Sequence, residues 1–162
     1  MGILGRWRLS AGMGLVLLLT VAGCGLLEPG IERGEGGAIL TAGDLKAFDL
    51  RLGDCFNAAD AREVESVAVM PCSDDHDFEI YHVFQLDDGA YPGQEAIEDE
   101  WVDRCLARFE PFVGLSYDTS VLDISALFPT EESWKQDDRE VLCALTAVDE
   151  LPRAGSARGS GV

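Results

Sequence analysis

The sequence predicts an α+β domain, in which a largely antiparallel sheet packs one face against a single main helix and disulfides staple the two together. Two observations carry this prediction. Short segments of alternating apolar and polar residues, typical of half-buried strands, lie before and after one long segment with helical spacing. The elements therefore follow the order βββαββ, and strands grouped around one helix are typical of α+β domains.

Five segments have the alternation that predicts strands. They span residues 48–52, 64–70, 78–84, 122–128 and 141–147. Turn-forming residues separate the first three strands, at residues 57–61 (NAADA) and 73–75 (SDD). A polar loop, PTEESWKQDD, joins the last two strands.

One segment predicts a long helix that begins after Pro92-Gly93 and ends at Gly114. Its apolar residues recur at helical spacing and form one broad stripe for burial against the sheet. The stripe consists of Ile97, Trp101, Cys105, Phe109 and Val113, with Val102, Leu106 and Phe112 beside it. Acidic residues fill the first turns, where the helix dipole favours negative charge.

Four cysteines of the folded part, Cys55, Cys72, Cys105 and Cys143, predict two disulfides. Four cysteines allow three pairings. Cys105 lies on the apolar stripe of the helix, and Cys143 lies on one face of the last strand with other apolar residues. We therefore favour Cys105–Cys143, pinning helix to sheet, together with Cys55–Cys72. A zinc site is the alternative, but the sequence has no CxxC and no paired ligand spacing.

The fifth cysteine, Cys24, directly follows a secretory signal. Arg6 and Arg8 precede an apolar run over residues 9–22, shorter than the ~20 apolar residues of a comfortable membrane span. The run ends in Val-Ala-Gly-Cys24, which looks like a bacterial lipobox, whose cysteine receives a diacylglycerol. The alternatives are an ordinary signal peptide or an uncleaved anchor. We expect a lipoprotein on the outer, extracytoplasmic face of the cell membrane, where disulfides are permitted.

These features divide the chain into four parts. They are a signal peptide (1–23), a lipidated Cys24 with a glycine-rich tether (24–44), a folded domain (45–151) and a disordered tail (152–162). Without the signal peptide, ten basic residues remain against 30 acidic ones, a net charge of about −20. Phosphate backbones require a basic surface, so we exclude nucleic acid as a partner and attribute the acidity to solubility.

Short motifs in a fixed order, together with the four cysteines, resemble the septum-formation family of actinobacterial exported and membrane-anchored domains. The motifs are Gly53-Asp54-Cys55-Phe56, Val69-x-Pro71-Cys72, His76-x-x-Glu79-Ile80, Tyr91-Pro92-Gly93, residues 128–134 (FPTEESW) and Asp138-Arg139-x-x-x-Cys143. The resemblance covers residues 50–147. It implies an envelope protein linked to cell division, without a known reaction.

Two positions depart from the family's pattern. Asp75 stands where the family tends to have proline, and Asp137 stands where it tends to have glycine. The second departure bears on the turn before the last strand, because aspartate tolerates a positive φ less well than glycine.

His76 lies among Asp74, Asp75, Asp77 and Glu79, a composition that could serve acid–base chemistry or a metal. We favour a structural role for His76 in its turn, because no second histidine lies at a spacing suited to binding a shared metal. The other histidine, His82, lies six residues on and belongs to a strand. Glu131 and Glu132 could pair as in glycoside hydrolysis, but adjacent loop residues usually diverge. No catalytic residue, metal or cofactor is therefore predicted.

Trp134, in an acidic loop, is either an exposed binding anchor or a lid packed on the sheet edge. We predict a binding surface near His76, Trp134 and Arg139. The leading function is a non-enzymatic, lipid-anchored binding or scaffold module of the cell envelope, with an envelope or division protein as partner. The alternatives are a metal-dependent or carboxylate enzyme acting on cell-wall polymer, and a small-ligand or cation-binding lipoprotein.

Overall fold

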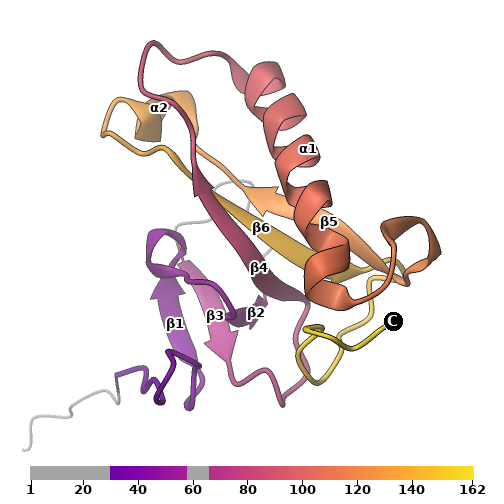
Figure 1. Cartoon of the computed structure of the whole chain (residues 1–162). Helices are drawn as coiled ribbons and strands as arrows, with labels where there is room; N and C mark the ends of the chain where they lie inside the picture. The colour runs from indigo at the N-terminus through magenta and orange to yellow at the C-terminus, as the bar shows by residue number, and fades with distance from the viewer. Residues whose placement is uncertain (1–29, 58–65) are drawn as a thin grey trace, which may run out of the picture.

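The computed structural model describes residues 30–57 and 66–162 (Figure 1). The predicted signal peptide, Cys24, the first part of the tether and most of the turn predicted at 57–61 lie outside these residues. Within them, no helix is long and apolar enough to cross a membrane.

Six strands form one antiparallel sheet in the order β1-β3-β2-β4-β6-β5. They are β1 (Gly43–Lys46), β2 (Cys55–Asn57), β3 (Ser66–Met70), β4 (Phe78–Gln85), β5 (Leu122–Leu127) and β6 (Glu140–Ala147). The helices are α1 (Gln94–Val113), the short α2 (Glu131–Trp134), and the 3₁₀ turns η1 (Ala47–Asp49) and η2 (Tyr117–Thr119). The predicted α+β class is confirmed, with one strand more than the predicted order βββαββ.

The extra strand arises where the first prediction is wrong. Residues 48–52 do not form a strand, because the chain turns through η1 and Leu50 N donates to Ala47 O at 3.3 Å. Only Leu50 of the alternating residues is buried, whereas Phe48 and Leu52 are exposed. The segment instead joins two short strands, β1 and β2, that both pair with β3.

Both faces of the sheet are covered, and β6 shows this most clearly. Val141, Cys143 and Leu145 face the core under α1, while Leu142 and Ala144 belong to a second core on the other face. The predicted helical stripe is confirmed at Ile97, Cys105, Phe109 and Val113, all fully buried, while Val102 and Leu106 are exposed. In Figure 1, α1 lies across β4, β6 and β5.

Both predicted disulfides are present. Cys105–Cys143 joins α1 to β6 with a Cα–Cα distance of 5.6 Å, and Cys55–Cys72 joins β2 to the end of β3 at 5.2 Å. Beside the first of them, the Tyr81 hydroxyl donates to Cys105 O at 2.8 Å. Burial in this core raises the pKa of Tyr81.

The tether expected to extend to residue 44 is folded over its described part, residues 30–44. Ile39 is buried in the second core, and Ile31 and Leu45 pack against that core. Arg33 donates from its two terminal nitrogens to the buried Asp54 carboxylate, at 2.6 and 2.8 Å. The expectation fails here because two isoleucines and one arginine supply enough contacts to hold a glycine-rich segment against the sheet.

The segment from residue 152 to 162, here the C-terminal segment, is ordered and corrects the expected disordered tail. Arg153 exchanges two backbone hydrogen bonds with His76, at 3.1 and 2.9 Å. Gly159 N and Gly161 N donate to the carbonyls of Phe112 and Val113, at 2.8 and 2.9 Å. These carbonyls end α1 and need partners outside the helix. Hydrogen bonds, most of them from its backbone, hold this segment, so its low apolar content wrongly indicated disorder.

Candidate functional site

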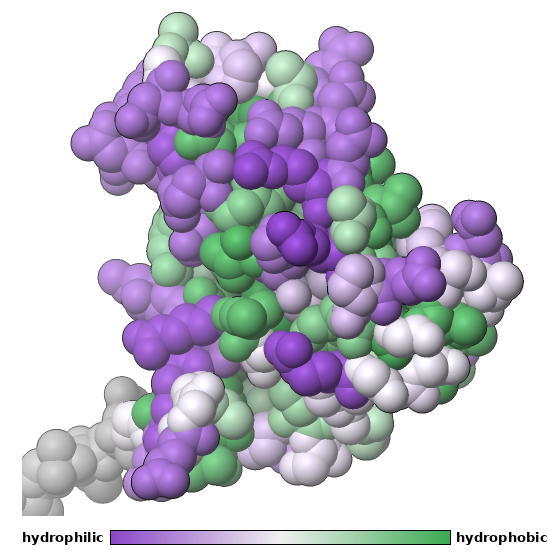
Figure 2. All heavy atoms as spheres, in the orientation of Figure 1, coloured by the Kyte–Doolittle hydropathy of each residue, from purple (hydrophilic) through white to green (hydrophobic). Residues whose placement is uncertain are grey.

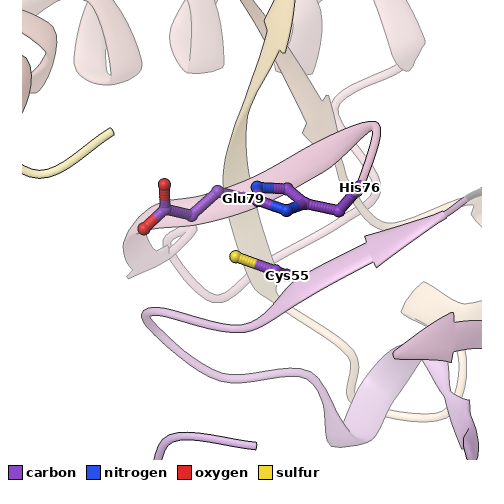
Figure 3. A group of neighbouring side chains, drawn as sticks. All are labelled: Cys55, His76 and Glu79. Atoms are coloured by element: carbon purple, nitrogen blue, oxygen red, sulfur yellow. The ribbon is translucent and has the colours of Figure 1, made fainter. Parts of the chain in front are cut away.

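His76, Glu79 and Cys55 converge at the end of the sheet that the C-terminal segment covers (Figure 3). Cys55 in β2 and Glu79 in β4 are partners across the two strands, so their side chains share the face of the sheet that α1 also covers. His76 precedes β4 and is only 6% exposed. One potential ligand atom from each of the three residues lies within 4.8 Å of the others.

Glu79 fastens the C-terminal segment. Its two carboxylate oxygens accept hydrogen bonds from Ser156 Oγ and Ala157 N, both at 2.6 Å. Glu79 is 3% exposed, so these bonds satisfy a charge that would be costly to bury alone. Sequence reasoning missed this role, although the His76-x-x-Glu79 motif contains both residues, because the partners lie 77 and 78 residues away.

Hydrogen bonds from both its ring and its backbone hold His76 in place. Its ring Nδ1 lies 2.9 Å from Asp74 O, and its backbone pairs with that of Arg153. A backbone carbonyl only accepts, so Nδ1 carries a proton and donates it to Asp74 O, which leaves Nε2 with a lone pair. His82, by contrast, lies half-buried in β4, and burial, with smaller contributions from Arg108 and Arg104, lowers its pKa.

A cavity of about 430 Å³ is lined by His76 and Glu79 together with residues 151–157. Both side chains are buried, so only a small part of each faces the cavity.

Replacing Glu79 with Gln is expected to free the C-terminal segment, because a neutral amide cannot accept from both Ser156 and Ala157 as the carboxylate does. We expect a loss of about 1–3 kcal/mol in the free energy of unfolding, the cost of leaving buried donors without partners. Hydrogen exchange should show faster exchange at Ala157, Gly159 and Gly161. The exposed Glu95→Gln serves as the control. Unchanged protection in Glu79→Gln would contradict this role.

Trp134 and Arg139 lie together at the opposite end of β4 and β6 from His76. Trp134 is 6% exposed and donates from Nε1 to Gly89 O at 3.0 Å. The Arg139 guanidinium stacks 3.8 Å from the Trp134 ring centre and donates to Trp134 O at 2.9 Å. Of the two roles considered for Trp134, the packed lid is the observed one. His76 therefore shares no surface with Trp134 and Arg139.

The turn before β6 keeps the shape that glycine would give it. Asp137 adopts a φ of 64° in the left-handed region, at the position where the resembled family tends to have glycine. Asp137 N donates to Trp134 O at 3.2 Å, and the turn leads directly to Arg139. The departure from the family's pattern thus leaves the turn that positions Arg139 intact.

A second hollow, here the α2 groove, has a volume of about 930 Å³ and is lined by sequence neighbours of Trp134 and Arg139, among them Ser133, Lys135 and Asp138. Its aromatic walls are Phe48, Tyr91 and Phe128, and its acidic side chains include Glu131, Glu132 and Glu140. Burial, with a smaller contribution from the charge of Asp138, raises the pKa of Glu140, while a hydrogen bond from Gln85 opposes this. Figure 2, in the orientation of Figure 1, shows mostly hydrophilic residues around α2 and scattered hydrophobic residues over the rest of the visible surface.

These features define a two-disulfide α+β domain in which a C-terminal segment completes one face of the sheet. The chain belongs to the septum formation family, whose model matches residues 46–160. The match takes in most of the C-terminal segment, which is therefore part of the family's domain. No curated protein and no solved structure is significantly similar to the chain.

Proposed function

We propose that this septum formation family member is a non-enzymatic binding or scaffold module of the cell envelope. In this proposal, lipid on Cys24 holds the chain on the outer face of the membrane, and a folded domain contacts an envelope or division protein. One observation carries the proposal: the polar side chains best suited to catalysis, His76 and Glu79, are buried and hold the C-terminal segment in place.

The α2 groove is the surface we assign to the partner. Phe48, which lines the groove, is 65% exposed and offers a partner a large aromatic side chain. The three glutamates around it favour a partner with basic residues, since opposite charges speed encounter and select partners. Trp134 and Arg139 do not line the groove. They contribute by fixing the backbone of α2 and of the turn that follows it.

Capture of the partner from envelope fractions tests the assignment. The lipidated full chain, cross-linked in the membrane, is expected to retain a defined envelope protein. Phe48→Ser should reduce the yield at least about tenfold, as loss of a binding hot spot does. Leu106→Ser is the matched control, because Leu106 is an exposed apolar residue of α1 outside the groove. Equal losses in both variants, or none in either, would contradict the assignment.

The lipid anchor has its own test, because Cys24 lies outside the residues that the structure describes. Cys24→Ser should move the protein to the soluble fraction or leave it unprocessed, since no diacylglycerol can then be attached. Fractionation and mass spectrometry of the mature N-terminus measure this. A Cys24→Ser protein that still carries lipid and stays in the membrane would disprove the lipobox assignment.

A further inference from the structure

We propose that reduction of the Cys55–Cys72 disulfide opens a binding site for a thiophilic divalent cation such as zinc. The inference is independent of the proposed function. Cys55, His76 and Glu79 already bring potential ligand atoms within 4.8 Å of one another. Cys72 adds a fourth, because its sulfur is bonded to that of Cys55. Two thiolates, one imidazole and one carboxylate make a four-ligand set of the kind that zinc takes in tetrahedral sites.

His76 has the hydrogen-bond support that metal-binding histidines usually have. Its Nδ1–H donates to Asp74 O at 2.9 Å, so the lone pair is on Nε2. Histidines that bind metals usually donate their other ring N–H to a carbonyl or carboxylate, which fixes the tautomer and the ring orientation. The backbone pair with Arg153 holds the residue itself. This support is present before any ion arrives.

Glu79 has equivalent support. Ser156 Oγ and Ala157 N each occupy one lone pair on a different carboxylate oxygen, so each oxygen retains a second one for a metal. In Figure 3, the Cys55 sulfur lies beside the His76 ring, with the Glu79 carboxylate to one side. The 430 Å³ cavity that His76 and Glu79 line provides an entry path for the ion.

The disulfide keeps the site closed. A dithiol reductant supplies two electrons and two protons: the Cys55–Cys72 S–S bond breaks, two thiols form, and the reductant becomes a disulfide. A divalent cation then displaces the two thiol protons, because the thiolate is the ligand form. Cys72 is half-buried whereas Cys105 and Cys143 are both fully buried, so a reductant reaches the first disulfide more easily. Among the described residues, no other cluster of this kind occurs, and none surrounds Cys105–Cys143.

The sequence alone did not assemble this set, because Cys55 lies 17 residues before Cys72 and only strand pairing brings it beside Glu79. Cys55 is in β2, Cys72 and His76 follow β3, and Glu79 is in β4. The missing CxxC spacing excludes a zinc knuckle, but it does not exclude ligands assembled by strand pairing.

Metal titration of the full chain tests the proposal. A phosphine reductant is applied until peptide mapping shows Cys55 and Cys72 free and Cys105–Cys143 intact, and zinc or cobalt(II) is then added alone. We expect one metal per chain, a four-coordinate cobalt spectrum with thiolate charge-transfer bands, and native near-UV circular dichroism. The oxidised chain should bind none at this site.

Variants then assign the ligands. His76→Ala and Glu79→Gln are each expected to weaken zinc affinity at least about tenfold, since even supporting residues have effects of this size. His76→Cys, which restores a ligand, should recover four-coordinate cobalt binding. Equal binding by oxidised and reduced chains, binding that requires loss of the native circular dichroism, or affinity unchanged by both His76→Ala and Glu79→Gln would overturn the proposal.

Discussion

Replacing Arg33 with Met is expected to cost about 3–5 kcal/mol in the free energy of unfolding, because it leaves a charge buried without its counterion. Asp54 is 1% exposed and receives two hydrogen bonds from Arg33, at 2.6 and 2.8 Å. Asp54 also accepts from Arg51 N at 2.8 Å, so it keeps the turn between η1 and β2 closed. The hydrogen bond to Asp54 raises the pKa of Arg33, as expected for a guanidinium paired with a carboxylate.

Urea denaturation of the full chain measures this loss. Lys135→Met is the matched control, because the Lys135–Glu131 ion pair is 3.2 Å long but exposed on both sides. Exposed pairs contribute about 0–1 kcal/mol, so the control should stay within that range. A loss below about 1 kcal/mol for Arg33→Met would show that Asp54 finds another partner or water, and that the folded part of the tether is not fastened as described.

The second large effect is expected for the Cys105→Ala, Cys143→Ala double variant. The disulfide closes a 38-residue separation and joins α1 to β6, whereas Cys55–Cys72 spans 17 residues within adjacent strands. Loop-closure entropy gives about 4 kcal/mol for the first disulfide and about 3 kcal/mol for the second. Losing Cys105–Cys143 also removes the covalent link between helix and sheet in the middle of the main core.

Thermal and urea unfolding of the two double variants, under non-oxidising handling, compare these costs. We expect the Cys105/Cys143 variant to be the less stable of the two and to lose the near-UV circular dichroism of its core aromatic residues at the lower temperature. A Cys105/Cys143 variant within about 1 kcal/mol of the unmodified chain would contradict the view that this disulfide is a main support of the fold.

Alternation and helical spacing predicted most of the fold because β3, β4, β5, β6 and α1 are each long enough for a period to be recognised. The same logic placed Cys105 and Cys143 on facing surfaces, which gave the correct pairing. It failed at residues 48–52, where Phe48 and Leu52 have the same strand spacing as the buried Leu50 but face solvent. The strands β1 and β2 are four and three residues long, too short for alternation to be recognised.

The candidate site was only partly predictable for a different reason. The motif identified His76 as structurally placed in its turn, and the structure buries it there. Its neighbours, however, come from residues 55 and 153–157, and the latter are held by backbone hydrogen bonds and by the Glu79 carboxylate. Composition cannot reveal backbone pairing over such separations, so a glycine- and serine-rich segment was expected to be disordered.

The most direct measurement is the activity of the purified chain on peptidoglycan fragments, with and without added zinc and with its disulfides intact, beside the His76→Ala variant. Because His76 is buried and engaged in hydrogen bonds, His76→Ala should lose about 1–3 kcal/mol of stability and melt at a lower temperature. Neither protein is expected to turn over the fragments. Turnover that His76→Ala abolishes while the melting temperature stays unchanged would contradict the binding role and establish an enzyme.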